Sequence, residues 1–372
     1  MTTIKEIAAH LKITPTAVSY ALNGRTGKVS AATQQRVLET ARRMGYQPHA
    51  AARALRTGRH YAILTLIRTP QSPYYAEIMH CLVQQVLAHP YQIIIQRAAR
   101  PEEESKSLAL DPTNISALHT GVDGYFIVDA PQTAAALRKS QAARTHPKPV
   151  ISLGVFYDEG GDFVGVDLSQ GTREAVLHLL QCGCRRIAYL IDAGTYSLNE
   201  SRRAAYVSAL EDAGFLPEFL VVPEQSRAAA YQFTRDYIAA EGCPDGMLCV
   251  NDEMAMGAHR SLLDLGRRIP EDVALVGCDG IPEARYARPS LATIVQPIGE
   301  MCQLAWGLLE RRLEQPMLAP QQTLLVAKLS VQASACGSPS DGDTTELPFF
   351  TEIPFFTEIP FSGESPLPTT NH

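Results

Sequence analysis

Five side chains of this sequence have the chemistry to hold a small polyhydroxylated molecule. Tyr74 and Tyr75 begin a predicted helix, and their rings suit stacking on a sugar C–H face or on a base. Arg202 begins another helix, and its guanidinium donates to two hydroxyls or to one carboxylate. Asn251 donates and accepts, and Asp279 accepts from two vicinal hydroxyls. The set predicts a binding pocket for a small molecule, with a sugar or sugar phosphate favoured.

Each of these residues also has a purely structural interpretation. Arg202 can be a surface charge, and Asp279 can cap a turn. Asn251 or Asp252 can cap the helix that follows them. For the ligand, a nucleobase, a protein co-effector or no effector at all remain alternatives to a sugar.

The elements that must position these residues alternate regularly from residue 61 onward. Apolar runs predict strands at 63–67, 92–96, 124–128, 150–153, 186–191, 219–222, 246–250 and 273–277. Helical periodicity lies between them at about 75–88, 170–182, 201–213, 228–241 and 253–265. Such alternation predicts the α/β class, with doubly wound parallel sheets whose ligands bind at the carboxyl ends of the strands. More than ten elements over about 270 residues predict two lobes.

The first 48 residues have a different, all-helical pattern. Helices are predicted over about 4–11, 15–22 and 31–44. Thr14 followed by Pro15 is typical of a helix start, and Ser30 caps the third helix. Two short helices joined by a tight turn predict a helix-turn-helix, which is a DNA-binding motif.

The charge of the chain is divided between its two parts. Residues 1–60 contain ten Lys or Arg and two acidic residues, a net charge of +8. Because the whole chain carries −6, the remainder carries −14. A small basic head on an acidic body indicates that nucleic acid contacts the head alone. The alternative is a chance fluctuation of surface charge.

Several classes of protein are disfavoured by what the sequence lacks. The eight cysteines form no C-x-x-C pair and have no histidine cluster beside them, so neither a metal site nor a disulfide framework is expected. No cofactor is expected. There is no secretory h-region and no run of about 20 apolar residues, so we expect a cytoplasmic protein without a membrane partner. Nucleophile elbows and P-loops are absent, so we expect no enzyme.

Two segments lie outside the predicted domains. Residues 49–60 are an Ala- and Arg-rich linker. Residues 336–372 contain a repeated Thr-Glu-Ile-Pro-Phe-Phe unit, whose prolines disfavour helix and central strand, so a disordered tail is predicted. The tail's phenylalanines leave a sticky interaction motif as the alternative. The expected divisions are 1–48, 49–60, 61–335 and 336–372.

Motifs in order along residues 1–335 resemble those of the lac-repressor/purine-repressor family. The segments that carry the resemblance are Thr3–Ala8, Thr16–Asn23, Gly165–Asp167, Val250–Asp252, Arg268–Val273, Val276–Asp279 and Arg288–Ile294. The resemblance implies a two-lobed body of the periplasmic sugar-binding kind and a ligand-controlled homodimeric repressor of a pseudo-palindromic operator. An activator is the functional alternative, and a transport binding protein is the rival that shares the fold.

The resemblance also implies which residues contact double-stranded DNA. The recognition helix places Pro15, Thr16 and Tyr20 toward base edges, with backbone contact alone as the alternative for Tyr20. Ser19 and Asn23 are expected on phosphates. In the linker, Arg53 and Arg56 are expected on phosphates, and Leu55 is expected to wedge a central base step open. An ordinary connector with a buried Leu55 is the alternative.

The effector contacts implied by the resemblance are Arg202, Asn251 and Asp279, the same residues that the side-chain chemistry selects. Two positions depart from the family pattern. Lys12 lies in the turn where glycine is common, and Gly154 lies where some relatives carry aspartate. One hydroxyl contact is therefore either missing or supplied by another residue.

Overall fold

The computed structural model describes residues 2–22, 27–46, 58–68, 71–87, 89–98, 121–158, 160–197 and 201–336. Four of the predicted DNA-contacting residues, Asn23, Arg53, Leu55 and Arg56, lie outside these ranges, as do nearly all of the predicted linker and tail.

The head consists of three short helices, as predicted. They are α1 (Ile4–Leu11), α2 (Pro15–Leu22) and α3 (Ala31–Arg43). Thr3 and Glu6 form a reciprocal capping box on α1, and the Thr14 hydroxyl accepts from the Ala17 N–H at the start of α2. Ile7, Ala8, Val18, Ala21, Val37 and Ala41 form the buried core between the helices. This apolar core fixes α2 across α1, which leaves the first turn of α2 exposed.

Lys12 occupies the turn between α1 and α2 in the left-handed conformation, with φ 53° and ψ 44°. Because a side chain in this conformation is strained, we expect Lys12→Gly to stabilise the head by about 1 kcal/mol. The measurement is amide hydrogen exchange at the buried head residues Ile7 and Val18. Lys12→Ala is the matched control, since it removes the charge but keeps Cβ. Equal stabilisation by both variants would contradict the conformational explanation.

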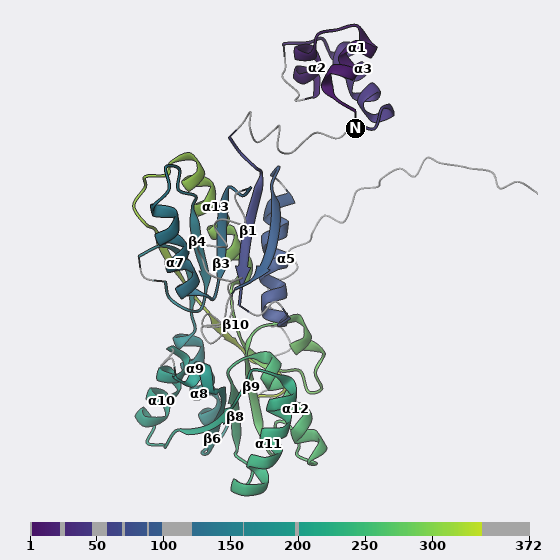
Figure 1. The fold of residues 1–372 in the computed structure, drawn as a ribbon. Coiled ribbons are helices and arrows are strands. Elements are labelled where there is room, and N and C mark those ends of the chain that lie inside the picture. The colour runs from purple at the N-terminus through teal and green to yellow at the C-terminus, as the bar shows by residue number, and fades with distance from the viewer. Residues whose placement is uncertain are drawn as a thin grey trace, which may run out of the picture.

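The N-lobe is built on a six-stranded sheet with strand order β11-β5-β4-β3-β1-β2 (Figure 1). Its strands, all parallel, are β1 (Ala62–Ile67), β2 (Gln92–Arg97), β3 (Gly124–Val128), β4 (Val150–Gly154), β5 (Asp162–Asp167) and β11 (Gln322–Val326). Helix α5 (Pro73–Leu87) packs against α13 (Ile298–Glu314), which also covers β4 and β5. Helix α7 (Pro131–Ala142) packs on β3 and β4.

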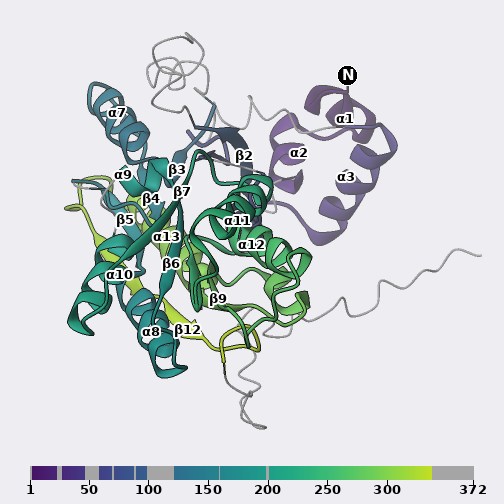
Figure 2. The same ribbon diagram turned by 90° about the horizontal axis from the view of Figure 1, so that it is seen from below.

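The C-lobe has a second six-stranded sheet with order β12-β10-β9-β8-β6-β7. Its strands are β6 (Ile187–Asp192), β7 (Glu218–Val222), β8 (Gly246–Cys249), β9 (Ala274–Asp279), β10 (Ala292–Val295) and β12 (Lys328–Ser330). Helices α8 (Ser169–Gln181) and α10 (Ser201–Asp212) lie together on one side of this sheet, and α11 (Arg227–Glu241) and α12 (Asp252–Asp264) on the other (Figure 2). Two short pieces, α9 (Ala193–Ser197) and the 3-10 helix η1 (Pro282–Tyr286), complete it.

The two-lobed α/β prediction is confirmed, but the sequence did not predict the strands β5, β10, β11 and β12 or the helices α7 and α13, and one strand differs in direction. β12 pairs antiparallel with β10, at the edge of an otherwise parallel sheet. The chain enters β12 from β11 through Ala327 alone, and so short a connection leads directly from the edge of one sheet to the edge of the other. The chain passes between the lobes after β5, after β10 and after β11.

Within the described ranges, no helix combines the length and apolar character needed to cross a membrane. The same ranges contain no group of three or more His, Cys, Asp or Glu side chains arranged to hold a metal ion. All eight cysteines are free thiols, four of them buried and four partly exposed.

Candidate functional site

The exposed end of α2 carries the residues predicted to read DNA. Pro15 and Thr16 are exposed in its first turn, and Ser19 and Tyr20 are half-buried one turn later. Val18 between them is fully buried against α1 and α3, so its neighbours in sequence point away from the head's core. Of the five residues predicted on the recognition helix, Asn23 lies outside the described ranges.

The basic side chains of the head are presented to solvent. All six Lys and Arg residues in the described part of the head are exposed, namely Lys5, Lys12, Lys28, Arg36, Arg42 and Arg43. An exposed guanidinium or ammonium keeps its charge available to an external phosphate. This surface is therefore suited to a polyanion.

All five predicted ligand residues line one cavity between the lobes. Tyr74 and Tyr75 reach it from α5 of the N-lobe, and Arg202, Asn251 and Asp279 reach it from the C-lobe. Every one of them is less than 10% exposed. Residues far apart in sequence thus converge where the strands of both sheets end, as the topological rule predicts.

Arg202 and Asn251 are both fixed by backbone contacts. The Arg202 Nη1 donates to the carbonyl of Val250 at 2.5 Å. The Asn251 Oδ1 accepts from the Met254 N–H at 2.8 Å and so caps α12, while its Nδ2 donates to Gln225. Asn251 therefore serves as a helix cap and also lines the cavity, so the two interpretations of its role are compatible.

Asp279 ends β9 with a positive φ of 128° and is fully desolvated. Its Oδ1 accepts from Gln296 Nε2 at 2.9 Å. Burial raises the pKa of Asp279 well above its usual value; the nearby Asp252 carboxylate raises it further, and Arg202 opposes the shift. The turn after β9 is held instead by Asp252, whose Oδ2 accepts from the N–H groups of Gly280 and Ile281.

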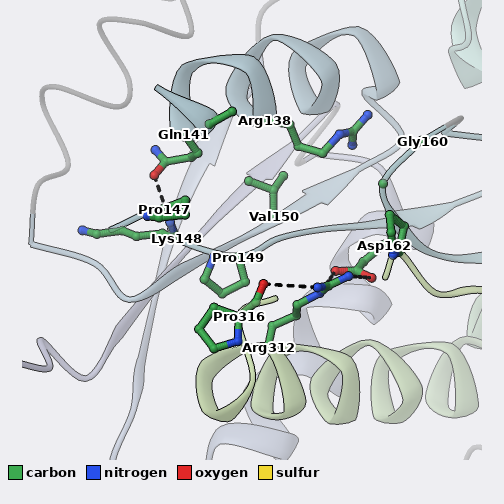
Figure 3. A pocket seen from close by; sticks show the side chains of 13 residues that line it. Arg138, Gln141, Pro147, Lys148, Pro149, Val150, Gly160, Asp162, Arg312 and Pro316 are labelled. Atoms are coloured by element: carbon green, nitrogen blue, oxygen red, sulfur yellow. Dashed lines mark hydrogen bonds and ion pairs between the residues drawn. The ribbon is translucent and has the colours of Figure 1, made fainter. Parts of the chain in front are cut away.

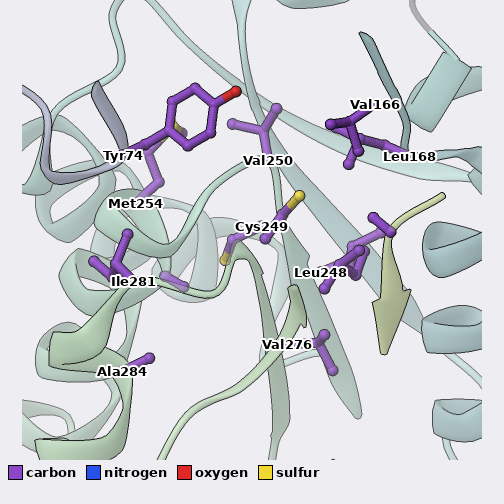
Figure 4. Packing of buried hydrophobic residues seen from close by; sticks show 14 of the residues in the cluster. Tyr74, Val166, Leu168, Leu248, Cys249, Val250, Met254, Val276, Ile281 and Ala284 are labelled. Carbon is purple, nitrogen blue, oxygen red and sulfur yellow. The ribbon is translucent and has the colours of Figure 1, made fainter. Parts of the chain in front are cut away.

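The two tyrosines form the wall contributed by the N-lobe. Their rings meet edge to face with centroids 5.0 Å apart. The Tyr74 hydroxyl donates to Gln296 Oε1 at 3.3 Å, on the segment that connects β10 to α13. Tyr74 also belongs to the buried apolar cluster that includes Val250 and Met254 of the C-lobe (Figure 4). An aromatic surface facing amides and charged groups is suited to a ligand with both C–H faces and hydroxyls.

Comparisons with known proteins match both parts of the chain. The profile of bacterial regulatory proteins of the lacI family matches residues 3–49, and that of the periplasmic binding protein-like domain matches residues 176–335. The HTH-type transcriptional repressor PurR of Haemophilus influenzae (strain PittEE) is 26% identical over 299 residues, 80% of this chain and 86% of that protein. PurR of Yersinia pestis bv. Antiqua is 25% identical over 91% of this chain and 98% of its own length.

Solved structures share the fold. The lac repressor dimer bound to operator and the anti-inducer ONPF aligns with a TM-score of 0.77 and 21% identity, covering 90% of this chain and 99% of that one. The CelR–cellobiose complex aligns at 0.61 and 23%, over 90% and 100%. A regulator from Enterococcus faecium with bound ribose aligns at 0.63 and 25%, over 74% and 98%.

The chain belongs to the lacI family of transcriptional regulators. It is a DNA-binding regulator and not an enzyme, as the sequence predicts. The body has the periplasmic-binding-protein-like fold that accompanies the lacI-type head.

This lacI-family regulator lines its cleft with further residues that sequence reasoning missed, among them Arg68, Asp129, Gln225 and Gln296. Each lies in a loop that follows a strand: β1, β3, β7 and β10 respectively. Their position directly after buried strands was the available signal, since the carboxyl ends of parallel strands meet at one edge.

Asp129 supplies a carboxylate beside Gly154, the position where some relatives carry aspartate. Its Oδ1 accepts from the Val155 N–H at 2.7 Å, and its buried Oδ2 has no hydrogen-bond partner among the described residues. A Cβ added at Gly154 would lie 2.1 Å from Asp129 Oδ1. The end of β3 therefore places a carboxylate where the end of β4 has no side chain.

We expect Gly154→Ala to destabilise the body by about 3 kcal/mol or more, because it adds a clash to a positive φ. Gly160→Ala is the control, since Gly160 also has a positive φ, 86° against 127° at Gly154, with nothing within 4 Å of an added Cβ. The control should cost about 1 kcal/mol. Urea denaturation measures the free energy of unfolding of both variants. Equal losses of stability would show that the Asp129 side chain can move away from the added Cβ without a cost in free energy.

The cavity itself is small, with a volume of about 30 Å³. This is room for roughly one water molecule. A ligand the size of a sugar therefore requires the lobes to separate or the lining side chains to move.

A larger hollow of about 290 Å³ lies elsewhere in the N-lobe, between α7 and the end of α13 (Figure 3). Its two guanidinium groups, those of Arg138 and Arg312, already form hydrogen bonds within the chain. Arg312 pairs with Asp162 and donates to carbonyls of the following loop, and Arg138 makes two hydrogen bonds to Asp158. Volume alone therefore does not identify the ligand site, and the interlobe cavity has the more suitable chemistry.

Proposed function

We propose that the chain is a homodimeric transcriptional repressor whose operator binding is controlled by a neutral sugar held between the two lobes. The observation that carries the proposal is the convergence of buried polar side chains from both lobes on one cavity. A ligand that bridges the lobes stabilises the closed arrangement relative to the open one. Such a ligand can shift the population of the DNA-binding state.

The chemistry of the cleft favours a neutral polyol. Two cations, Arg68 and Arg202, share the lining with two acidic side chains, Asp129 and Asp279, whose pKa values burial raises. An added phosphate would bring more negative charge beside both acidic side chains, whereas sugar hydroxyls can hydrogen-bond to them and accept from the guanidinium groups. The structural relatives that hold cellobiose and ribose are consistent with this class of ligand.

On the DNA side, we propose that residues 1–48 bind an operator half-site and that residues 49–60 form a hinge helix on the DNA. The proposed contacts are Pro15, Thr16, Ser19, Tyr20, Asn23, Arg53, Leu55 and Arg56. Residues 61–335 then form the effector-binding and dimerisation body, and 336–372 a tail outside it. Because the proposed partner is operator DNA, we propose that the protein acts in the cytoplasm.

The test is in two parts. A genome-wide profile of bound DNA identifies the operator and the genes beside it. A thermal-shift panel on the full-length protein then compares neutral sugars, sugar phosphates and nucleobases. Stabilisation by a sugar alone supports the proposal, and stabilisation by a nucleobase alone overturns the ligand class while leaving the regulator intact.

The dimer is proposed from apolar side chains exposed on one side of both lobes. Val83 and Leu87 on α5 are 40% and 74% exposed, and Ile95 on the edge strand β2 is 51% exposed. In the C-lobe, Leu263 at the end of α12 is 42% exposed. Helices α5 and α12 lie on the same side of the body, at the right of Figure 1. An apolar edge strand beside an apolar helix face favours burial against a second copy.

We expect Leu87→Glu to shift the protein from dimer to monomer at micromolar concentration, because the interface would then bury a charge. Met317→Glu is the control: Met317 is 93% exposed in the loop between α13 and β11, and its neighbour Pro316 lines the hollow beside α7. Sedimentation velocity measures both variants. A dimer that survives Leu87→Glu places the interface elsewhere.

A further inference from the structure

The chain enters the N-lobe through a junction that one carboxylate holds. Asp123 is buried and lies directly before β3. Its Oδ1 accepts from the His60 N–H at 2.8 Å, and its Oδ2 accepts from the Tyr61 N–H at 2.7 Å. These two residues are the last before β1, whose start lies at the end of the N-lobe away from the C-lobe (Figure 1). The carboxylate therefore fixes the backbone at the point where the linker joins the body.

Tyr61 has a strained backbone at this junction. Its φ is 56°, in the left-handed region, which costs free energy for any residue with a Cβ. Its carbonyl accepts from the Gln92 N–H at 2.9 Å, so its backbone is hydrogen-bonded on both sides. Together with the two bonds to Asp123, this contact fixes three successive peptide groups and thereby the direction in which the chain leaves the sheet. Strain of this kind persists only where the surrounding contacts enforce it, and it is concentrated at functional positions.

A group of aromatic rings connects the junction to helix α13. The Tyr61 ring contacts the Tyr91 ring with centroids 5.6 Å apart, and Tyr91 meets Trp306 of α13 edge to face at 5.8 Å. Trp306 is buried and also packs against Phe126 of β3. The core of the N-lobe therefore sets the position of the Tyr61 side chain as well as that of its backbone.

The same helix also contacts the carboxylate side of the junction. Leu309 of α13 packs so closely on Gly124, the residue after Asp123, that a Cβ added there would lie 2.7 Å from Leu309 Cδ1. At its other end, α13 begins two residues after Gln296, which lines the effector cleft. One helix thus lies against the junction and against the cleft.

The C-lobe repeats the carboxylate contact at a place where no linker enters. Asp245 lies directly before β8, as Asp123 lies before β3, and its Oδ2 accepts from the N–H groups of Arg185 and Arg186 at 2.9 Å. These arginines precede β6, as His60 and Tyr61 precede β1, but the chain reaches them from α8 of the same lobe. A comparison of the two carboxylates therefore separates their common part in the fold from any part that Asp123 plays toward the linker.

We propose that Asp123 is a positioning residue for operator binding, and that with Tyr61 and Tyr91 it forms an anchor that fixes the direction of the linker. The role toward DNA rests on the proposed repressor function. The proposed contacts Arg56 and Leu55 precede His60 by only four and five residues, so the direction set at the anchor determines where they can reach. A dimer must place two heads on two half-sites at once, and a loose anchor lowers the effective concentration of the second head. Binding to phosphates of random DNA needs no such match.

The first experiment measures amide hydrogen exchange in the full-length protein without DNA or effector. Asp123→Asn keeps the size of the side chain, but its amide nitrogen cannot accept from a backbone N–H. Exchange of the His60 and Tyr61 amides should therefore quicken by about tenfold. Asp245→Asn is the control and should leave both amides unchanged. Exchange at wild-type rates in Asp123→Asn overturns the anchor.

The second experiment measures the affinity of the full-length protein for two duplexes of equal length, the operator found in the genome-wide profile and a random sequence. Asp123→Asn should bind the operator about tenfold more weakly and the random duplex within about twofold of wild type. Asp245→Asn should bind both duplexes as wild type does. Tyr61→Asn is a second variant, because asparagine tolerates the left-handed conformation and only the ring contact with Tyr91 is lost. It should also weaken binding to the operator alone.

Wild-type operator affinity in Asp123→Asn overturns the positioning role, even where its amide exchange is faster. An equal loss of affinity for both duplexes overturns it as well, as does a loss in Asp245→Asn as large as that in Asp123→Asn. If Asp123→Asn does not fold, the operator affinity of Tyr61→Asn decides. If wild-type protein prefers no duplex over another, the proposed repressor function fails, whereas the exchange measurement still tests the anchor.

Discussion

Raising the salt concentration from 50 to 200 mM is expected to weaken operator binding by about 10³- to 10⁵-fold. The reason is that the exposed cations of two heads displace counterions from the DNA backbone, with roughly six to ten phosphate contacts per dimer. The six exposed Lys and Arg residues described in each head are sufficient for that number. Fluorescence anisotropy of a labelled operator, titrated at a series of salt concentrations, measures the slope of log affinity against log salt.

The control is a fragment that begins at residue 61 and lacks the basic head. It should not bind operator at any of these salt concentrations, because the remaining chain carries a net charge of −14. Operator binding by this fragment would contradict the assignment of DNA binding to the head. A flat salt dependence of the full-length protein would show instead that phosphate contacts are few.

The second large effect is expected on ligand response. Asp279→Ala removes an acceptor from the cleft, and a bound ligand would then bury hydroxyls without partners, at a cost of about 1 to 3 kcal/mol. Effector affinity should fall by roughly one to two decades, while operator affinity without effector stays normal. Because burial already disfavours the charged form of Asp279, its removal should cost the fold little. Arg202→Ala should lose a similar part of the response.

The measurement is operator affinity with and without the sugar that the thermal-shift panel identifies. Asp279→Asn keeps an oxygen for Gln296 and should give an intermediate response. Arg173→Ala is a matched control on a solvent-exposed ion pair with Asp212 and should respond like wild type. If Asp279→Ala and Arg202→Ala both switch at wild-type ligand concentrations, the effector binds elsewhere and the cleft residues are structural.

Much of the fold could be predicted because local patterns agree with the final packing. Buried strands such as Ala62–Ile67 and Ile187–Asp192 are apolar apart from Thr65 and the terminal Asp192, and the head helices have caps and turn residues at both ends. Strand β5 was harder to recognise because Gly165 interrupts its short apolar run, which Asp162 and Asp167 bound. The antiparallel direction of β12 depends on a contact with β10, more than 30 residues earlier, which no local pattern encodes.

In the candidate site, too, some residues could be predicted from local patterns and others only from contacts in the folded protein. Arg202, Asn251 and Asp279 could be chosen because their chemistry and their positions beside buried strands point to one edge of a sheet. Asp129 was missed, although it follows the strand Gly124–Val128 directly. Its role becomes visible only when β3 and β4 are paired and the space beside Gly154 is known. A sequence records which side chain is absent at one position, but the neighbour that fills the space is a property of the folded sheet.

The interleaving of the two lobes has a consequence for how the chain is made. During synthesis from the N-terminus, the N-lobe sheet is incomplete until its last strand, β11, has been made, which requires the chain to reach residue 326. The apolar faces of β4 and β5 stay uncovered until α13 emerges more than 130 residues after them. Neither lobe can therefore finish folding on the ribosome before the other is nearly complete. A nascent chain of this regulator passes through a long stage with a partly open hydrophobic sheet, when chaperones are most needed.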